Sequence, residues 1–157
     1  MRTAALSCCV TLILLAACSA PPKPQEQPAA ATQPPKATDE SRRFPKPGLV
    51  AATVVDNHIW DQEFMPGGTV ARYKRGKTEY GMMVSKLSTP TDAAILLLDW
   101  KKAMPDGVLV PSFGGYYGNV QGRPVFVFTK NSWIAGISGL NQKQADAEAR
   151  VLAAALD

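Results

Sequence analysis

The uneven distribution of proline and large apolar residues divides the chain near residue 46. Residues 19–46 are rich in Pro, Ala, Gln and Lys and contain almost no large apolar side chains. A segment of that composition cannot bury a core, so we expect residues 18–46 to form a disordered tether with polyproline II character. Residues 47–157 instead show the apolar periodicity of strands and helices. A chain of 157 residues with this division is expected to form one folded domain, over 47–157.

The charge distribution argues against a nucleic-acid partner. The formal net charge is +4, but residues 47–157 contain 11 basic and 10 acidic residues. The domain is therefore close to neutral, and most of the excess positive charge lies in residues 1–46. A duplex-binding surface requires basic residues clustered on the domain itself.

All three cysteines, Cys8, Cys9 and Cys18, lie in the first 18 residues. The domain therefore has no disulfide, no thiol nucleophile and no cysteine-based metal site. Its stability must come from an ordinary apolar core, which a domain of this size can provide. Such a composition also suits an oxidising compartment.

The first 17 residues have the pattern of a secretory signal. A short positive region, Met1-Arg2-Thr3, precedes an apolar stretch from Ala4 to Ala17. That stretch is shorter than the roughly 20 residues needed to span a bilayer, and it is typical of the apolar core of a signal peptide.

The signal ends in Leu15-Ala16-Ala17-Cys18, which resembles the lipobox of bacterial lipoproteins at all four positions. The resemblance covers the leader only. It implies cleavage before Cys18 and a lipid anchor, including palmitate, on that cysteine. Two or three acyl chains hold a protein firmly at a membrane, whereas one chain does so only marginally.

The lipoprotein resemblance also implies a place in the cell. In Gram-negative lipoproteins the residue after the lipidated cysteine influences sorting, and here it is Ser19 rather than the Asp associated with retention at the inner membrane. We therefore expect a lipid-anchored protein in the cell envelope, at the inner leaflet of the outer membrane and facing the periplasm.

The domain sequence predicts an α+β fold, in which an antiparallel sheet of roughly five to six strands carries two helices. Thr89 and Asn141 are the expected helix N-caps. The predicted strands are 48–55, 69–75, 78–86, 114–120, 124–130 and 132–138, and the predicted helices are 88–104 and 141–156.

Two surfaces of the domain are candidate binding sites. The first is a basic hairpin with Arg72, Lys74, Arg75 and Lys77, which suits an anionic partner; its alternative is a solvated edge protected by charge. The second is a glycine–aromatic groove, whose alternative is that the aromatic rings cover the glycines within the sheet. Its residues are Phe113, Gly114, Gly115, Tyr116, Tyr117 and Trp133.

Familiar catalytic patterns are incomplete in this chain. Ala71 occupies the position of the first glycine of a phosphate-binding loop that would end in Gly76-Lys77-Thr78. The sequence GISGL at 136–140 has its second glycine one residue too early for a nucleophile elbow. The only histidine, His58, lies close in the sequence to Asp56, Asp61 and Glu63. The spacing of these four residues matches no metal or acid–base motif.

These observations favour a non-catalytic binding module that holds an envelope protein or cell-wall polymer near the membrane. A small-ligand binder or carrier in the periplasm is the alternative, and an enzyme built around His58 is a third, weaker one. We expect no cofactor and no metal.

The lipobox makes a direct prediction about Cys18. Replacing Cys18 by Ala should abolish incorporation of radioactive palmitate, because the acceptor thiol is then absent. Cys9→Ala is the matched control and should be labelled like the wild type. Equal labelling of the Cys18→Ala variant would contradict the assignment of the anchor.

Overall fold

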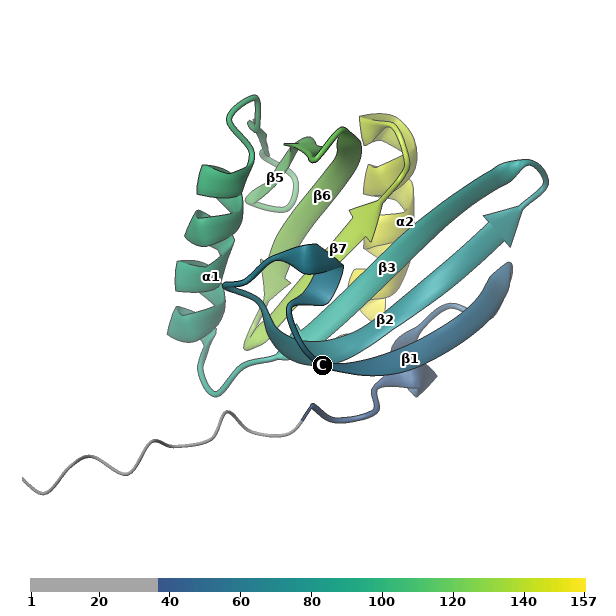
Figure 1. The fold of residues 1–157 in the computed structure, drawn as a ribbon, viewed down its shortest axis with the longest axis horizontal. Helices are drawn as coiled ribbons and strands as arrows, with labels where there is room; N and C mark the ends of the chain where they lie inside the picture. The colour runs from purple at the N-terminus through teal and green to yellow at the C-terminus, as the bar shows by residue number, and fades with distance from the viewer. Residues whose placement is uncertain (1–36) are drawn as a thin grey trace, which may run out of the picture. The chain divides into compact units, whose positions relative to one another are not determined.

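Residues 37–157, which the computed structural model describes, form an α+β fold with one antiparallel sheet and two α-helices (Figure 1). The strands are β1 (Leu49–Asn57), β2 (Pro66–Arg75), β3 (Thr78–Lys86), β4 (Val108–Val110), β5 (Gly115–Val120), β6 (Arg123–Lys130) and β7 (Trp133–Ser138). The helices are α1 (Pro90–Ala103) and α2 (Gln142–Ala154), with short 3-10 turns η1 (Ser41–Arg43) and η2 (Ile59–Asp61).

The sheet is built from two meanders that meet in its middle. Its strand order is β1-β2-β3-β7-β6-β5-β4, and every neighbouring pair is antiparallel. The chain forms β1 to β3, crosses through α1 to the opposite edge, and returns strand by strand until β7 pairs with β3. Residues distant in the sequence, such as Gly81 and Ser138, thereby become neighbours.

Both helices begin at the expected caps. The Thr89 hydroxyl accepts a hydrogen bond from the Asp92 backbone N–H, and the Asp92 carboxylate accepts one from the Thr89 N–H, which completes a capping box. The Asn141 side chain accepts from the backbone N–H of Gln144 at the start of α2. The predicted α+β architecture is confirmed.

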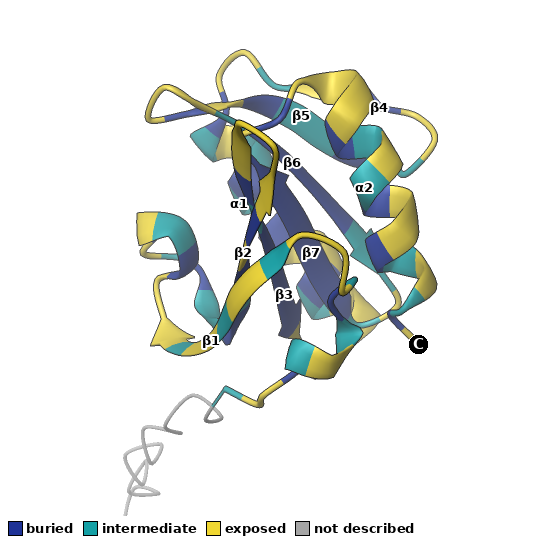
Figure 2. Ribbon diagram, turned by 90° about the vertical axis from the view of Figure 1, so that its right-hand side faces the viewer, coloured by how far each residue is buried: buried dark blue, intermediate teal, exposed yellow. Residues whose placement is uncertain are grey.

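The two helices cover opposite faces of the sheet, because side chains alternate along the central strands. On β6, Phe126 and Phe128 join the core beneath α2, whereas Val125 and Val127 join the core beneath α1. All residues of β7 (Trp133–Ser138) are buried, as expected for a strand covered on both faces. Figure 2 shows this central region in dark blue between the helices.

Residues 37–46, here called the N-terminal strap, pack against the domain. The backbone N–H of Glu40 donates to the Thr69 hydroxyl on β2 at 2.9 Å, and that hydroxyl donates to the Thr38 carbonyl. Phe44 is 1% exposed within the core beneath α2. The strap therefore belongs to the fold, although its composition resembles that of the residues before it.

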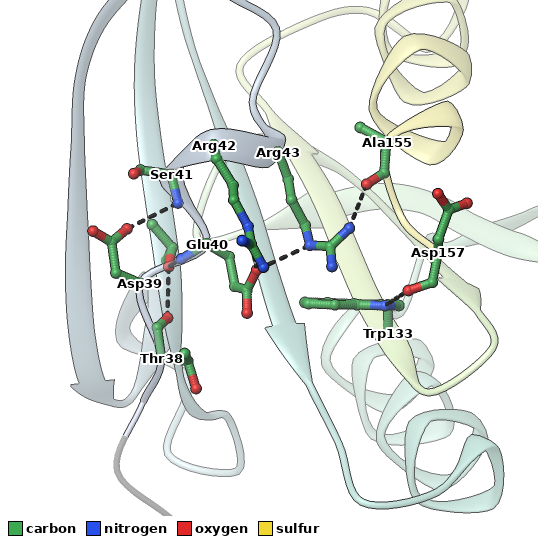
Figure 3. Close-up of polar contacts among 10 residues, drawn as sticks. Thr38, Asp39, Glu40, Ser41, Arg42, Arg43, Trp133, Ala155 and Asp157 are labelled. Atoms are coloured by element: carbon green, nitrogen blue, oxygen red, sulfur yellow. Dashed lines mark hydrogen bonds and ion pairs between the residues drawn. The ribbon is translucent and has the colours of Figure 1, made fainter.

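Arg43 joins the strap to the end of α2 (Figure 3). Its guanidinium donates to the Glu40 carboxylate at 2.9 Å and to the Ala155 carbonyl at 2.7 Å. It also lies over the Trp133 ring, 4.5 Å from the ring centroid. A cation at this position satisfies a carbonyl that helix geometry leaves without a partner and complements the negative helix end.

Two expectations need correction. The structure has seven strands over residues 37–157, not five to six, because the three-residue strand β4 is too short to show a period of two. The expectation of disorder is wrong for the strap, since Glu40, Phe44 and Arg43 make specific contacts that composition does not reveal. Cys18, the signal at 1–17 and the rest of the tether lie outside the described residues.

The contacts of Arg43 predict that its replacement destabilises the domain more than replacement of its neighbour Arg42. Arg43→Ala should lower the free energy of unfolding by about 1–3 kcal/mol, since hydrogen bonds to charged groups contribute about that much. Arg42→Ala is the matched control: the Arg42 side chain is 79% exposed, and the change should stay within about 0.5 kcal/mol. Urea denaturation of both variants measures the difference, and equal losses would contradict the role of Arg43.

Candidate functional site

The face of the sheet that carries α1 is only partly covered. Helix α1 contacts β5, β6 and β7, while β1, β2 and β3 extend beyond it (Figure 1). On this uncovered part lies a hollow of about 570 Å³, here called the Trp60 groove. It is lined by Ala51, Thr53, Trp60, Val70, Ala71, Arg72, Glu79, Tyr80, Gly81, Arg123, Ser138 and Gly139.

The groove is hollow because three of the four residues in the row that crosses its floor are small. Ala51, Arg72, Gly81 and Ser138 form one row across four strands, since each is the register partner of the next. Gly81 has no side chain, and a Cβ placed there would lie 2.9 Å from the Ser138 hydroxyl oxygen. A larger residue at this crossing would fill the hollow.

Trp60 forms one wall of the groove. Its backbone has φ 54°, and His58 and Asp61 beside it have φ 53° and 59°, a conformation that is a true outlier for a bulky residue. Hydrogen bonds fix this short loop: the Gln62 side chain donates to the Trp60 carbonyl at 3.0 Å, and the His58 N–H donates to the Met65 carbonyl. Strain of this kind is found preferentially at binding and catalytic sites.

The Trp60 ring is held against the core on one side. It makes an edge-on contact with Trp100 of α1, with centroids 6.1 Å apart. It also lies above Gly136 of β7, where an added Cβ would come 2.9 Å from a ring carbon. Trp60 remains only partly buried, so the ring is fixed in position and still accessible from the groove.

Two arginines give the groove its positive charge. Arg72 and Arg123 are exposed and line the hollow, and within residues 37–157 neither takes part in an ion pair. The acidic residue in the lining, Glu79, pairs with Lys74 at 3.2 Å. An anion entering the groove would therefore meet two cations.

A smaller hollow of about 160 Å³ adjoins the groove and shares Trp60 and Arg123 with it. Asp61, Trp100 and Val125 also line this side hollow. The two hollows are continuous with each other at these two shared residues. The arrangement therefore suits an extended ligand that passes over Trp60.

The structure separates the four residues of the predicted basic hairpin. Arg72 points into the groove and Lys74 pairs with Glu79, whereas Arg75 lies on the opposite face and pairs with Glu148 of α2 at 2.7 Å. The hydrogen bond to Glu148 raises the pKa of Arg75. Lys77 lies in the exposed turn. The expected single patch is therefore not formed, and Arg72 is its only member in the groove.

The predicted glycine–aromatic groove is also not formed. Phe113 packs against Phe128 at 4.8 Å between centroids on the α2 face, whereas Tyr116 packs toward the core beneath α1. Tyr117 donates to the Leu140 carbonyl at 3.2 Å. Adjacent strand residues point to opposite faces, which divides this set.

The other members of that set have structural roles. Trp133 is 1% exposed and donates to the Asp157 carbonyl. Gly114 has φ 65° in the turn before β5, a conformation that favours glycine. Gly115 lies so close to the Val127 backbone and Phe128 that a Cβ would clash. The alternative interpretation, in which aromatic rings and close strands account for the glycines, describes this region better.

The four titratable residues around His58 do not converge. Asp56, His58, Asp61 and Glu63 are all exposed, and no hydrogen bond or ion pair joins the His58 side chain to the three carboxylates within the described chain. Over the same residues no group of three or more His, Cys, Asp or Glu side chains is arranged to hold a metal ion. The weaker enzyme hypothesis therefore gains no support.

Sequence reasoning found Arg72 but missed the other residues of the groove. Trp60 follows Ile59, which is 1% exposed in the core, and nothing in the local sequence distinguishes this tryptophan from a core residue. Arg123 and Ser138 carry no motif and reach the groove only through strand register. The usable signal was the alternation along β2, which places Arg72 opposite the buried Tyr73.

No helix between residues 37 and 157 is long and apolar enough to span a membrane. Comparison with known proteins found no matching family model, no significantly similar curated protein and no significantly similar solved structure.

The separation of the arginines predicts different effects on stability. Arg72→Gln and Arg123→Gln should each change the free energy of unfolding by no more than about 0.5 kcal/mol, because both side chains are exposed and unpaired within the described chain. Arg75→Gln should lower the urea midpoint below that of both variants, because it breaks the contact with Glu148. Equal urea midpoints for the three variants would contradict the different environments of Arg75 and of the two groove arginines.

Proposed function

We propose that this protein is a lipid-anchored component of the cell envelope whose domain is a non-catalytic binding module. Cys18 is the anchor, and the domain faces the periplasm from the inner leaflet of the outer membrane. The Trp60 groove is the surface that contacts a protein or cell-wall partner. The observation that carries this proposal is the groove itself, which is lined by a fixed tryptophan, two arginines and several small residues.

The form of the groove favours a polymer or protein over an enclosed small ligand. Ala51, Thr53, Arg72 and Arg123 in its lining are exposed, so the hollow opens to solvent along one side. Pockets for small ligands usually bury most of the ligand surface. The volume of about 570 Å³ nevertheless lies in the range of such sites, which is the observation in favour of a periplasmic carrier as the second candidate.

The segment between Cys18 and the domain is long enough for an anchored domain to contact a partner away from the membrane surface. Nineteen peptide steps separate Cys18 from Ala37, a distance of at most about 65 Å for an extended chain. Ala37 lies beside Gly67 near the start of β2, and Arg72 lies five residues further along that strand. The cationic part of the groove is thus displaced from the point where the chain enters the domain.

Site-specific photo-crosslinking in intact cells tests the proposal. A benzoylphenylalanine in place of Thr53, which is exposed in the groove, should form adducts with a protein or with detergent-insoluble cell wall. The matched control replaces Lys143, which is exposed at the start of α2 on the other face. Adducts should form from position 53, should be absent from position 143, and should disappear when Cys18 is replaced by Ala.

The outcomes separate the two candidates. Adducts that carry a protein or a cell-wall fragment support the binding module. An adduct whose added mass is that of a small molecule supports the carrier instead. Equal yields from positions 53 and 143, or no adduct at either, would contradict the groove as the contact surface.

A further inference from the structure

We propose that the Trp60 groove binds an acidic saccharide, with a sugar ring against Trp60 and its carboxylate held by Arg72 and Arg123. This inference rests on the proposed function, because it names the chemistry of the partner for the same groove. Three features carry it: a fixed aromatic ring, two cations without acidic partners in the described chain, and hydroxyl groups on the floor.

The Trp60 ring has the properties of a stacking platform. The contacts with Trp100 and Gly136 hold one part of the ring, and the strained backbone at φ 54° directs the side chain across the sheet. The faces of an aromatic ring carry partial negative charge, which attracts the polarised C–H bonds on one face of a pyranose. A fixed ring binds with little loss of side-chain entropy.

The two arginines suit a carboxylate. A guanidinium presents paired N–H donors that match the two oxygens of a carboxylate, so such pairs form bidentate contacts. Arg72 belongs to the row of residues across the floor, whereas Arg123 comes from the first position of β6 and also lines the side hollow. The two cations thus line the same hollow as Trp60.

The acidic groups near these arginines leave their charge available. Glu79, which lines the groove, pairs with Lys74 at 3.2 Å rather than with either arginine. Asp61 lines the side hollow but forms no ion pair with Arg123 within the described residues. A ligand carboxylate therefore replaces water rather than an existing protein partner.

The floor provides hydrogen-bonding groups for sugar hydroxyls. Ser138 is 2% exposed, lines the groove and makes no side-chain hydrogen bond within residues 37–157. Thr53 adds an exposed hydroxyl from β1. An isolated anion such as phosphate would satisfy the arginines but would leave Trp60 and these hydroxyls unused. The combination favours a sugar that carries its own carboxylate.

The adjoining side hollow extends the site along the ligand. Because it shares Trp60 and Arg123 with the groove, a second sugar unit can continue past the tryptophan. The open side of the groove allows both ends of the saccharide to leave. We therefore infer a segment within a longer acidic polysaccharide, one whose carboxylates are free, as the natural ligand.

Two tetrasaccharides of equal length isolate the role of the carboxylate. One alternates N-acetylglucosamine with N-acetylmuramic acid, which bears a free carboxylate, and the other contains only N-acetylglucosamine. The full chain, purified in mild detergent, is titrated with each by calorimetry. We expect the acidic tetrasaccharide to bind at least about tenfold more tightly, as expected for charge-assisted hydrogen bonds.

Matched variants identify the residues responsible. In the double variant Arg72→Gln/Arg123→Gln the acidic tetrasaccharide should bind no better than the neutral one. The control Lys77→Gln/Lys143→Gln removes two exposed charges elsewhere and should retain the full preference. Trp60→Leu should weaken both tetrasaccharides, and its urea midpoint shows whether the loop still folds.

Three results would overturn the inference. The first is equal affinity of the wild type for the two tetrasaccharides, or binding of neither. The second is an acidic preference that survives in the Arg72→Gln/Arg123→Gln variant. The third is competition by inorganic phosphate at the same concentration as the acidic sugar, which would indicate a general anion site. If adducts still form from position 53, such a result refutes only the sugar assignment and leaves the binding module intact.

Discussion

The width of the sheet relative to its helices is the constraint on which the structure depends. Seven strands spaced about 4.8 Å apart span roughly 29 Å, whereas a helix with its side chains is about 10 Å wide. One helix on each face therefore leaves several strands uncovered. On the α2 face the N-terminal strap covers part of this area, with Phe44 in the core and Arg43 at the helix end. On the α1 face the loop containing Trp60 covers part, and the Trp60 groove remains.

The two covering segments differ in ways that matter for function. The strap is held by Glu40 and Arg43, whose hydrogen bonds connect it to β2 and α2, so it completes the domain at the beginning of the described residues. The loop places Ile59 and Met65 in the core but leaves Trp60 at its surface with a strained backbone. Burial of its neighbours offsets that strain, which explains how an unfavourable conformation persists beside the groove.

Local patterns predicted most of the elements because their causes are local. The caps at Thr89 and Asn141 and the apolar stripes behind them give both helices, and alternation gives the six longer strands. Alternation failed to predict β4, because three residues are too few to show a period of two. Composition failed for the strap, because specific contacts hold it against the domain. At the site, the alternation along β2 places Arg72 on the face opposite the buried Tyr73. It also separated Arg72 from Arg75, a consequence that an interpretation based on charge alone overlooked.

The sequence by itself determined the α+β class, the positions of the helices and most strands, and the near-neutral charge of the domain, because composition, periodicity and capping act over a few residues. Only the tertiary structure decided that β7 lies beside β3, which brings Gly81 and Ser138 together and forms the groove floor. It also decided that Trp60 and Arg123 face this floor while Trp133 and Tyr117 face the other core. These relations depend on strand register and helix placement between distant segments, which no local pattern records.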